Sequence, residues 1–309
     1  MLSIPSYGVH RSVTTHNINI SVFCDWLEGC VLFQEDRDLS GSDVIDHLVE
    51  TQIYSTQNLA WELLADAWRE LRRRQNLLGA GYPVAVGERR LTRIREWRGT
   101  PAYAFCLILA FAKWYPSWAR QFGKDHTAQG ELFESLAKES LQKLFSGWVV
   151  HATGWRRSQT KKLANVVSEV AKLLSEGAGE RLRWTKPSAN DAGLDLLLFR
   201  PFPDNRVGVP VYLTQCASGG DWEGKLHTPS LRIWGKLIQF ASDPKKAFVT
   251  PFSWDDDEFR RNCNLVDGMV IDRYRLLSPG REEPDWILDD LRGSLIAWLE
   301  ARVQRLPFT

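Results

Sequence analysis

The N-terminal third of the chain carries apolar residues at helical spacing. Between residues 43 and 75 they recur three and four positions apart, which predicts a helix, and the Gly- and Pro-containing stretch 79–87 ends it. Residues 102–118 are apolar on nearly every side, so we expect a second helix at the centre of this unit. A short strand is expected at residues 18–23. The pattern predicts a mainly helical accessory or recognition domain over residues 1–125.

From residue 127 the pattern changes to helices that alternate with short apolar strands. The predicted helices are residues 130–145, 222–240 and 285–306, together with a segment that Ser158 caps and Gly177 stops. The predicted strands are residues 148–152, 193–199, 209–216, 246–250 and 269–272. The strands at 194–199 and 246–250 are continuously apolar, which is typical of central strands covered by helices on both faces. We therefore expect an α/β domain over residues 126–309, with a mixed sheet flanked by helices.

Two polar residues interrupt these apolar strands. Asp195 stands inside the run Gly193 to Phe199, and a carboxylate that enters a buried strand must be paired, hydrogen-bonded or bound to a cation. Gln215 ends the body of the next strand. Two adjacent strands that each deliver one oxygen to a shared edge favour a small hard-cation site, since Mg²⁺ takes a few protein oxygens and keeps several waters.

The same stretch resembles a known family. The helical sequence GELFESLAKESL is followed by GLDLLLF, a connecting loop, VYLTQCAS and a further helix. This order is similar to that of the PD-(D/E)XK nucleases, in the branch whose last acid is Gln, and the similarity covers residues from about 128 to 275. It implies a restriction-endonuclease-like core and Mg²⁺-dependent hydrolysis of DNA, with Mn²⁺ as a substitute, in a bacterial restriction or phage-defence setting.

The resemblance also implies roles for four residues. Asp195 would ligate the metal ion, and the Gln215 side-chain oxygen and the Cys216 carbonyl would complete the protein ligands. Glu134 would act on the metal directly or through water. A metal held in this way lowers the pKa of a bound water and neutralises charge on the transition state. The expected enzyme is a metal-dependent endodeoxyribonuclease.

One position departs from the family pattern. The family's lysine is expected two residues after the Gln, and Ala217 stands there. Lys225, in the helix that follows a Gly pair, is the nearest replacement, since the glycines let the chain turn back over the site. The departure leaves a second hypothesis open: a catalytically inactive nuclease-fold subunit that binds nucleic acid or assembles a larger defence complex.

Each candidate also has an ordinary structural interpretation. Asp195 could form an ion pair with Arg200 or Lys186, and Gln215 could be a buried amide whose hydrogen bonds are satisfied within the core. Glu134 could be a solvated helix acid, with Glu131 and Glu139 as rivals for its role. Lys225 could be an ordinary surface lysine. No single residue decides between the interpretations. The order of the residues along the chain carries the functional hypothesis.

Charge changes the expectation about nucleic acid only locally. The formal net charge is +1, so the whole chain gives no long-range attraction to phosphate. Residues 72–98 nevertheless hold eight Arg against two Glu, which suits phosphate binding or, equally, a solvated face that pairs with Glu62, Asp66 and Glu70. The residues that we expect to contact DNA are Arg89, Arg90, Arg156, Arg157, Lys161, Lys162 and Trp222. Trp222 either stacks on a base or anchors the loop that places Lys225.

Cysteine usage and hydropathy indicate the compartment. The five Cys are odd in number and contain no C-x-x-C, so neither a disulfide framework nor a zinc site is indicated. The longest apolar stretch, residues 102–112, is too short to span a bilayer, and the N-terminus has no signal pattern. We expect a cytoplasmic protein without a membrane partner, whose partners are DNA and either subunits of a defence complex or further copies of this chain.

Overall fold

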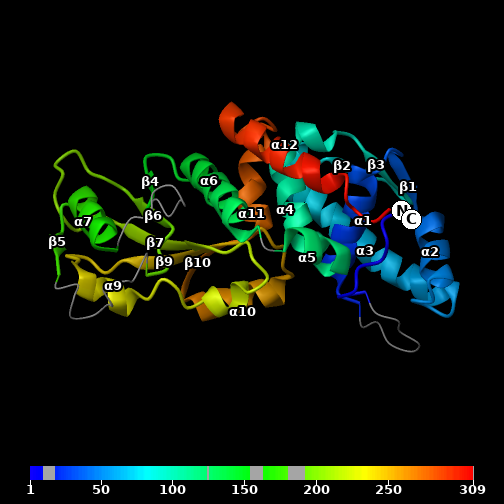
Figure 1. The fold of residues 1–309 in the computed structure, drawn as a ribbon, viewed down its shortest axis with the longest axis horizontal. Coiled ribbons are helices and arrows are strands. Elements are labelled where there is room, and N and C mark those ends of the chain that lie inside the picture. The colour runs from blue at the N-terminus through cyan, green and yellow to red at the C-terminus, as the bar shows by residue number, and fades with distance from the viewer. Residues whose placement is uncertain (10–17, 124, 154–162, 180–191, 309) are drawn as a thin grey trace. The chain divides into compact units, whose positions relative to one another are not determined.

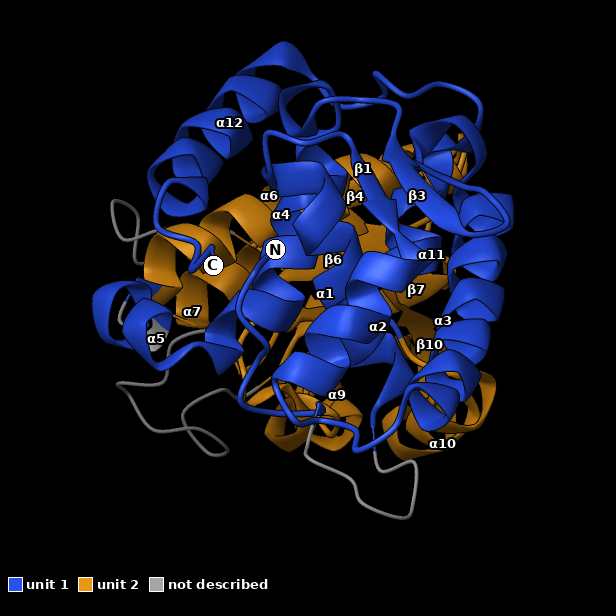
Figure 2. Cartoon of the chain, turned by 90° about the vertical axis from the view of Figure 1, so that its right-hand side faces the viewer, with its two compact units in different colours: residues 1–125, 251–253, 273–309 blue, residues 126–250, 254–272 orange. Residues whose placement is uncertain are grey.

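The computed structural model describes residues 1–9, 18–123, 125–153, 163–179 and 192–308 (Figure 1). The chain forms two compact units, shown in separate colours in Figure 2. Unit 1 contains Met1–Asp125, Pro251–Ser253 and Arg273–Thr309, and unit 2 contains His126–Thr250 and Trp254–Asp272. The expected boundary after residue 125 thus coincides with a boundary between the units. Residues 273–309, which we expected in the second domain, return to the first unit instead.

Unit 1 is mainly helical, with one small sheet. Its helices are α1 (Ile20–Phe33), α2 (Gly41–Glu50), α3 (Gln57–Leu78), α4 (Pro101–Phe111), α5 (Pro116–Phe122), α11 (Arg273–Leu277) and α12 (Asp289–Val303), with the short 3₁₀ turns η1 (Gly79–Gly81), η2 (Trp97–Gly99), η3 (Ala112–Trp114) and η6 (Ser278–Arg281). Strands β1 (Asp38–Ser40), β3 (Arg90–Arg93) and β2 (Val84–Val86) form an antiparallel sheet in that order. Every residue of α4 is buried, as its continuously apolar sequence predicts.

Three sequence expectations in unit 1 differ from the structure. The helix expected over residues 102–118 ends at Phe111, and η3 and α5 follow it. The strand expected at residues 18–23 is wrong: Asn19 caps α1 there, since its side chain accepts a hydrogen bond from the Val22 N–H at 3.0 Å. The single helix expected over residues 43–75 is two helices, α2 and α3. The chain breaks between them near Gln52, whose φ of 57° lies in the left-handed region.

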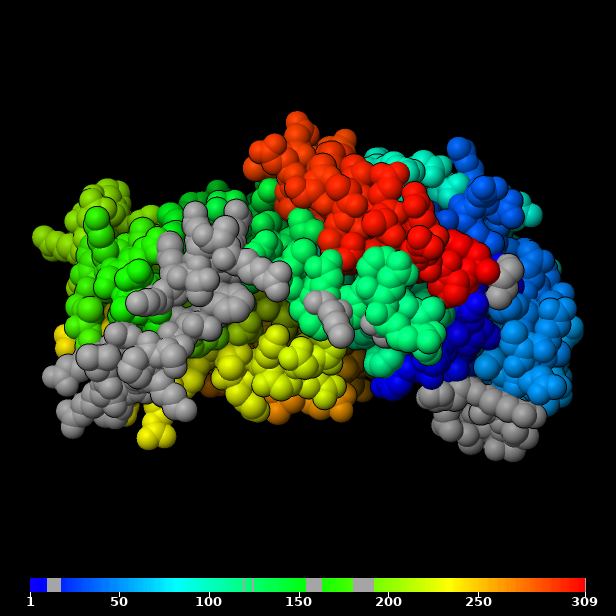
Figure 3. All heavy atoms as spheres, viewed as in Figure 1, coloured from blue at the N-terminus to red at the C-terminus, as the bar shows by residue number. Residues whose placement is uncertain are grey.

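The last helix explains why the C-terminal residues belong to unit 1. Trp298 of α12 packs edge-on against Phe105 of α4, with ring centroids 4.9 Å apart. The Arg302 guanidinium lies 4.7 Å from the centre of the Phe122 ring and is ion-paired with Asp125. Figure 3 shows α12, in red, against the green surface of α5. Burial of the apolar side of this helix therefore takes place on the helical unit.

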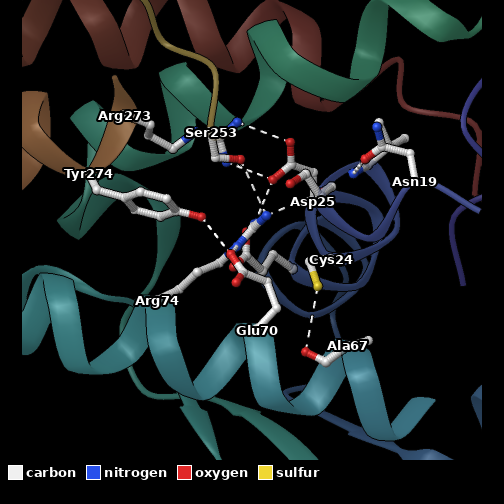
Figure 4. A network of polar contacts seen from close by, with 12 residues as sticks. Asn19, Cys24, Asp25, Ala67, Glu70, Arg74, Ser253, Arg273 and Tyr274 are labelled. Atoms are coloured by element: carbon white, nitrogen blue, oxygen red, sulfur yellow. Dashed lines mark hydrogen bonds and ion pairs between the residues drawn. The ribbon is translucent and has the colours of Figure 1, made fainter. Parts of the chain in front are cut away.

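A buried ionic network lies at the centre of unit 1 (Figure 4). Arg74 of α3, which is 0 % exposed, donates to Asp25 Oδ1 at 2.6 Å and to Glu28 Oε2 at 3.0 Å. Arg273 of α11 donates to both oxygens of Asp25, at 2.7 and 3.0 Å. Burial acts to raise the pKa of Asp25, but the charges of the two guanidinium groups outweigh it and hold this pKa below its ordinary value. Burial, as the largest influence, raises the pKa of Glu28.

The network also fixes the segments through which the chain re-enters unit 1. Arg74 donates to the Ser253 hydroxyl at 3.3 Å, and Arg273 donates to the Pro251 carbonyl at 2.8 Å. The Tyr274 hydroxyl donates to Glu70 at 2.8 Å. Residues 251–253 and 273–274 are therefore held against α1 and α3 by buried charges.

We expect Asp25→Asn to lower the free energy of unfolding by about 3–5 kcal/mol, because it leaves two buried guanidinium groups without their shared anion. Urea unfolding followed by tryptophan fluorescence measures the change. The matched control is Asp66→Asn, which removes an exposed pair with Arg69 at 2.9 Å and should cost less than about 1 kcal/mol. Equal effects of the two substitutions would contradict the structural role of the network.

Unit 2 contains the mixed sheet. Its elements are α6 (His126–Leu144), β4 (Val149–Ala152), α7 (Leu163–Leu174), β5 (Gly177–Ala178), β6 (Leu196–Phe199), β7 (Val211–Cys216), η5 (Trp222–Lys225), α9 (Leu231–Leu237), β8 (Ile238–Gln239), β9 (Lys245–Val249), α10 (Asp256–Val266) and β10 (Gly268–Ile271). The five-stranded sheet has the order β10-β9-β7-β6-β4. Strands β4, β6 and β7 are antiparallel neighbours, whereas β7, β9 and β10 run parallel. The predicted α/β class with a mixed sheet is confirmed.

Helices flank this sheet. Helices α7 and α9 share one core cluster with Leu197 and Phe199 of β6 and with Val211 and Leu213 of β7. Helix α6 packs against β4 and β7, and α10 packs against β9 and β10. Side chains from two neighbouring strands thus face the same helices, which fixes the register of β6 against β7.

The helix expected over residues 222–240 is interrupted. The turn η5 ends at Lys225, and α9 begins only at Leu231, where the Ser230 side chain caps it. Pro229 lies between them and has no N–H to donate into a continuous helix.

The predicted Ser158 cap lies outside the described residues. In the part of the chain that is described, no helix has the length and apolar character needed to cross a membrane.

Candidate functional site

Asp195 and Gln215 face each other across two antiparallel strands. The register pairs Leu196 of β6 with Thr214 of β7, so one residue further along Asp195 stands opposite Gln215. The Asp195 N–H donates to the Thr214 carbonyl at 3.0 Å, which extends the pairing to this point. Because side chains alternate along a strand, Asp195 shares its side of the sheet with the buried Leu197. The strands therefore bring together the two polar side chains that the sequence singled out.

The Gln215 amide points its nitrogen at two oxygens. Nε2 donates to Asp195 Oδ2 and, at 3.1 Å, to the Cys216 carbonyl. Asp195 Oδ2 also accepts the Cys216 backbone N–H at 2.6 Å. Asp195 and Gln215 are each 7 % exposed. A carboxylate oxygen and a backbone oxygen thus converge on one place, which is filled by the partly positive end of an amide.

Gly193 and Thr228 complete this arrangement. Gly193 has a φ of +75°, and a Cβ there would lie 3.0 Å from Thr228 Cβ and 3.3 Å from Gln215 Oε1. The Thr228 hydroxyl lies 3.0 Å from Gln215 Oε1 and 2.7 Å from the Lys225 carbonyl. Glycine is therefore required here both for its backbone conformation and for the space that it leaves beside the amide.

These residues open onto a cleft of about 820 Å³. Among the described residues, its walls include four carboxylates, from Glu131, Glu134, Asp195 and Asp221, and one lysine, Lys225. Such a lining disfavours a bare anion and favours a cation, or an anion that a cation bridges.

The Cys216 thiol lies in the same negatively charged surroundings. Burial, first of all, raises its pKa, and the negative charges of Asp195 and Glu134 raise it further. A raised pKa disfavours the thiolate, the form in which a cysteine acts as a nucleophile. Cys216 can contribute to the candidate site through its backbone carbonyl, as the resemblance implies.

Glu134 comes to the cleft from a different element. It lies on α6, is half-buried and lines the cleft together with Glu131, which precedes it by one helical turn. Glu131 therefore remains a rival for the role of helical acid.

Arg200 and Asp195 lie just beyond opposite ends of β6, and Arg200 is exposed. Lys186 lies outside the described residues.

Lys225 lines the cleft but already has an acidic neighbour. Its ammonium lies 3.7 Å from Asp221 Oδ1, and its side chain is 40 % exposed. Ala217, at the position of the family's lysine, is fully buried, and its N–H donates to the Val249 carbonyl at 2.9 Å. The lysine expected from the family pattern is thus replaced by a small residue packed at the end of the sheet.

The residues expected to contact DNA have different surroundings. Arg89 and Arg90 of unit 1 are exposed, whereas Arg156, Arg157, Lys161 and Lys162 lie outside the described residues. Trp222 packs on Trp254, with ring centroids 4.9 Å apart, which favours its role as an anchor of the loop before Lys225.

Much of the Arg-rich segment is engaged within unit 1. Arg74 belongs to the buried network, Arg73 pairs with Glu70 at 2.7 Å, and Arg98 pairs with Glu300. The side chain of Arg93 donates to the backbone carbonyls of residues 32, 34 and 35. Arg73 and Arg74 thus contact Glu70, one of the expected acidic partners, whereas Arg93 and Arg98 have partners that were not expected.

Sequence reasoning missed Gly193 and Thr228 as parts of the site. The sequence offers a signal for the first, because a glycine stands two residues before the strand carboxylate. Thr228 had no such signal, since its place beside Gln215 depends on the break between η5 and α9. Gln129 was also missed; its side chain donates to the Ser218 carbonyl at 3.0 Å and joins α6 to the loop after β7.

The possible donor set is limited in its chemistry. Within the described residues no group of three or more His, Cys, Asp and Glu side chains is placed to hold a metal ion. A cation at this cleft would instead use Asp195, the amide oxygen of Gln215, the Cys216 carbonyl and Glu134, a set of hard oxygens that suits Mg²⁺ with retained waters. Comparisons with protein-family models, with curated proteins and with solved structures found no match to this chain.

We expect Gly193→Ala to lower the free energy of unfolding by about 1–2 kcal/mol, because the left-handed backbone is strained by any Cβ and the methyl group crowds Thr228. Thermal and urea unfolding measure the effect. Gly235→Ala in α9 is the control: its Cβ has no neighbour within 4 Å, so we expect a gain of up to about 1 kcal/mol from the better helix former. The same sign of change in both variants would contradict this account.

Proposed function

We propose that the chain is a Mg²⁺-dependent nuclease that hydrolyses phosphodiester bonds in DNA, with a PD-(D/E)XK-like site in unit 2. The observation that carries the proposal is the convergence of Asp195 Oδ2 and the Cys216 carbonyl on the Gln215 amide, at the edge of an acidic cleft. Oxygens that converge in an acidic cleft are suited to a hard divalent cation. The polyanionic substrate would then approach the acidic cleft through the cation.

The arrangement of elements also supports the resemblance. Helix α6 carries Glu134 and packs on the sheet, β6 follows Asp195, and β7 carries Gln215 in antiparallel pairing with β6. The chain then passes through η5 to α9. This is the order of helix, two strands and helix on which the similarity to the nuclease family rests.

Each residue has a distinct part in the proposed reaction. Asp195, Gln215 and the Cys216 carbonyl would hold Mg²⁺, which supplies charge neutralisation and a water of lowered pKa. Glu134 would bind through a retained water or directly, from the helix that borders the cleft. Lys225 would turn from Asp221 toward the scissile phosphate and stabilise the charge that develops on its oxygens.

We expect purified protein to cleave DNA when Mg²⁺ or Mn²⁺ is present, and Asp195→Asn to reduce the rate at least about a hundredfold, because the substitution removes the anionic ligand. Gel-based cleavage of plasmid and linear DNA measures this. Asp204→Asn removes an exposed acid in the loop between β6 and β7 and should leave the rate unchanged. Undiminished cleavage by Asp195→Asn would overturn the assignment of the site.

A second candidate function is a nuclease-fold subunit without catalysis, which binds nucleic acid or assembles a larger defence complex. The observation that favours it is the pair of Ala217, packed at the family's lysine position, and Lys225, held near Asp221. The same assay separates the two functions. The inactive subunit would bind DNA or a partner, yet the unaltered chain would not cleave DNA with either metal ion.

A further inference from the structure

We propose that Thr228 is a positioning residue that lets the Gln215 amide turn over and present its oxygen to a divalent cation. This inference rests on the proposed function and assigns a role to a residue outside the motif that carries the family resemblance. The orientation of the amide is its basis, because a cation held between Asp195 Oδ2 and the Cys216 carbonyl would take the place that the Nε2 hydrogens occupy.

The described orientation of Gln215 is set by its neighbours. Nε2 faces two acceptors, the Asp195 carboxylate and the Cys216 carbonyl, whereas Oε1 faces the Thr228 hydroxyl at 3.0 Å. Every polar atom of the amide thus has a partner of the right kind. In this orientation the amide hydrogens serve the two oxygens that a cation would need.

Cation binding requires the opposite orientation. A cation held by Asp195 and the Cys216 carbonyl would repel the amide hydrogens and attract Oε1. When the amide turns over, Nε2 faces Thr228. Gln215 as a residue is only 7 % exposed, so Nε2 needs an acceptor there to avoid the cost of a buried and unsatisfied donor.

A hydroxyl group can meet both orientations. Thr228 Oγ1 has one proton and two lone pairs, and it lies between Gln215 Oε1 and the Lys225 carbonyl, which is 2.7 Å away. In the first orientation the hydroxyl can donate to Oε1. In the second it accepts from Nε2 while its own proton is donated to the Lys225 carbonyl. Thr228 thus offers the amide a hydrogen-bond partner in both orientations.

Gly193 keeps the space in which this exchange takes place. A Cβ at position 193 would lie 3.0 Å from Thr228 Cβ and 3.3 Å from Gln215 Oε1, so a side chain would push against both partners. The Thr228 hydroxyl also connects the amide to the end of η5, the turn that carries Lys225. One hydroxyl group thus contacts both the amide of the candidate cation ligand Gln215 and the backbone carbonyl of the candidate catalytic Lys225.

The test is calorimetric titration of Mn²⁺ into the full chain, into variants of Thr228 and into one control variant of Thr214. Thr228→Val keeps the shape of the side chain but removes its donor and acceptor, and we expect Mn²⁺ to bind about 10- to 100-fold more weakly, as for other partners of metal ligands. Thr228→Ser restores the hydroxyl and should bind within about threefold of the unaltered chain. Circular dichroism shows whether each variant is folded, and Thr228→Ala replaces the Val variant if that one does not fold.

Thr214→Val is the matched control. Thr214 precedes Gln215 on β7, and its buried hydroxyl has no hydrogen-bond partner among the described residues, so its loss should leave Mn²⁺ affinity unchanged. If the unaltered chain binds Mn²⁺ and Thr228→Val binds it equally well, the role of Thr228 is overturned and the proposed function stands. If the unaltered chain does not bind Mn²⁺, both the role of Thr228 and the proposed function are overturned.

Discussion

The candidate site depends on the burial of one carboxylate at the end of a strand. Asp195 is 7 % exposed, and a carboxylate so placed needs donors to offset the loss of water. The register of β6 against β7 supplies two of them, the Cys216 N–H and the Gln215 amide. A slip of one residue would turn Asp195 and the apolar residues of β6 to the opposite side of the sheet. Core packing on α7 and α9 therefore also determines the chemistry at the edge of the cleft.

Unit 1 also buries a carboxylate, that of Asp25, but stabilises it with different donors. There Asp25 accepts hydrogen bonds from two guanidinium groups, which lower its pKa and cancel its charge within the core. The donors that Asp195 receives from Gln215 and Cys216 are neutral amide groups rather than guanidinium groups. The first arrangement holds segments of the chain together. The second places a carboxylate beside a backbone carbonyl at the wall of an acidic cleft, an arrangement of hard oxygens that suits a cation.

The sequence predicted the sheet better than the helical unit, for physical reasons. Continuous apolar runs marked β6 and β9 as central strands, and the interruption at Asp195 marked the site, because a buried charge is rare and must have a partner. The strand expected at residues 18–23 was wrong because the cap at Asn19 outweighed the local apolar pattern. Arg74 was taken for part of a surface patch, since a sequence does not show that Asp25 and Glu28 would surround it. Thr228 reaches Gln215 only through tertiary folding.

In the proposed site, Asp195 and the Cys216 carbonyl hold a divalent cation together with Gln215. X-ray diffraction from crystals grown with Mn²⁺, recorded where manganese scatters anomalously, tests it most directly. We expect an anomalous peak between these two oxygens, with the Gln215 amide turned so that Oε1 faces the ion and Nε2 faces Thr228. The absence of a peak at this place, with Nε2 still directed at both oxygens, would contradict it.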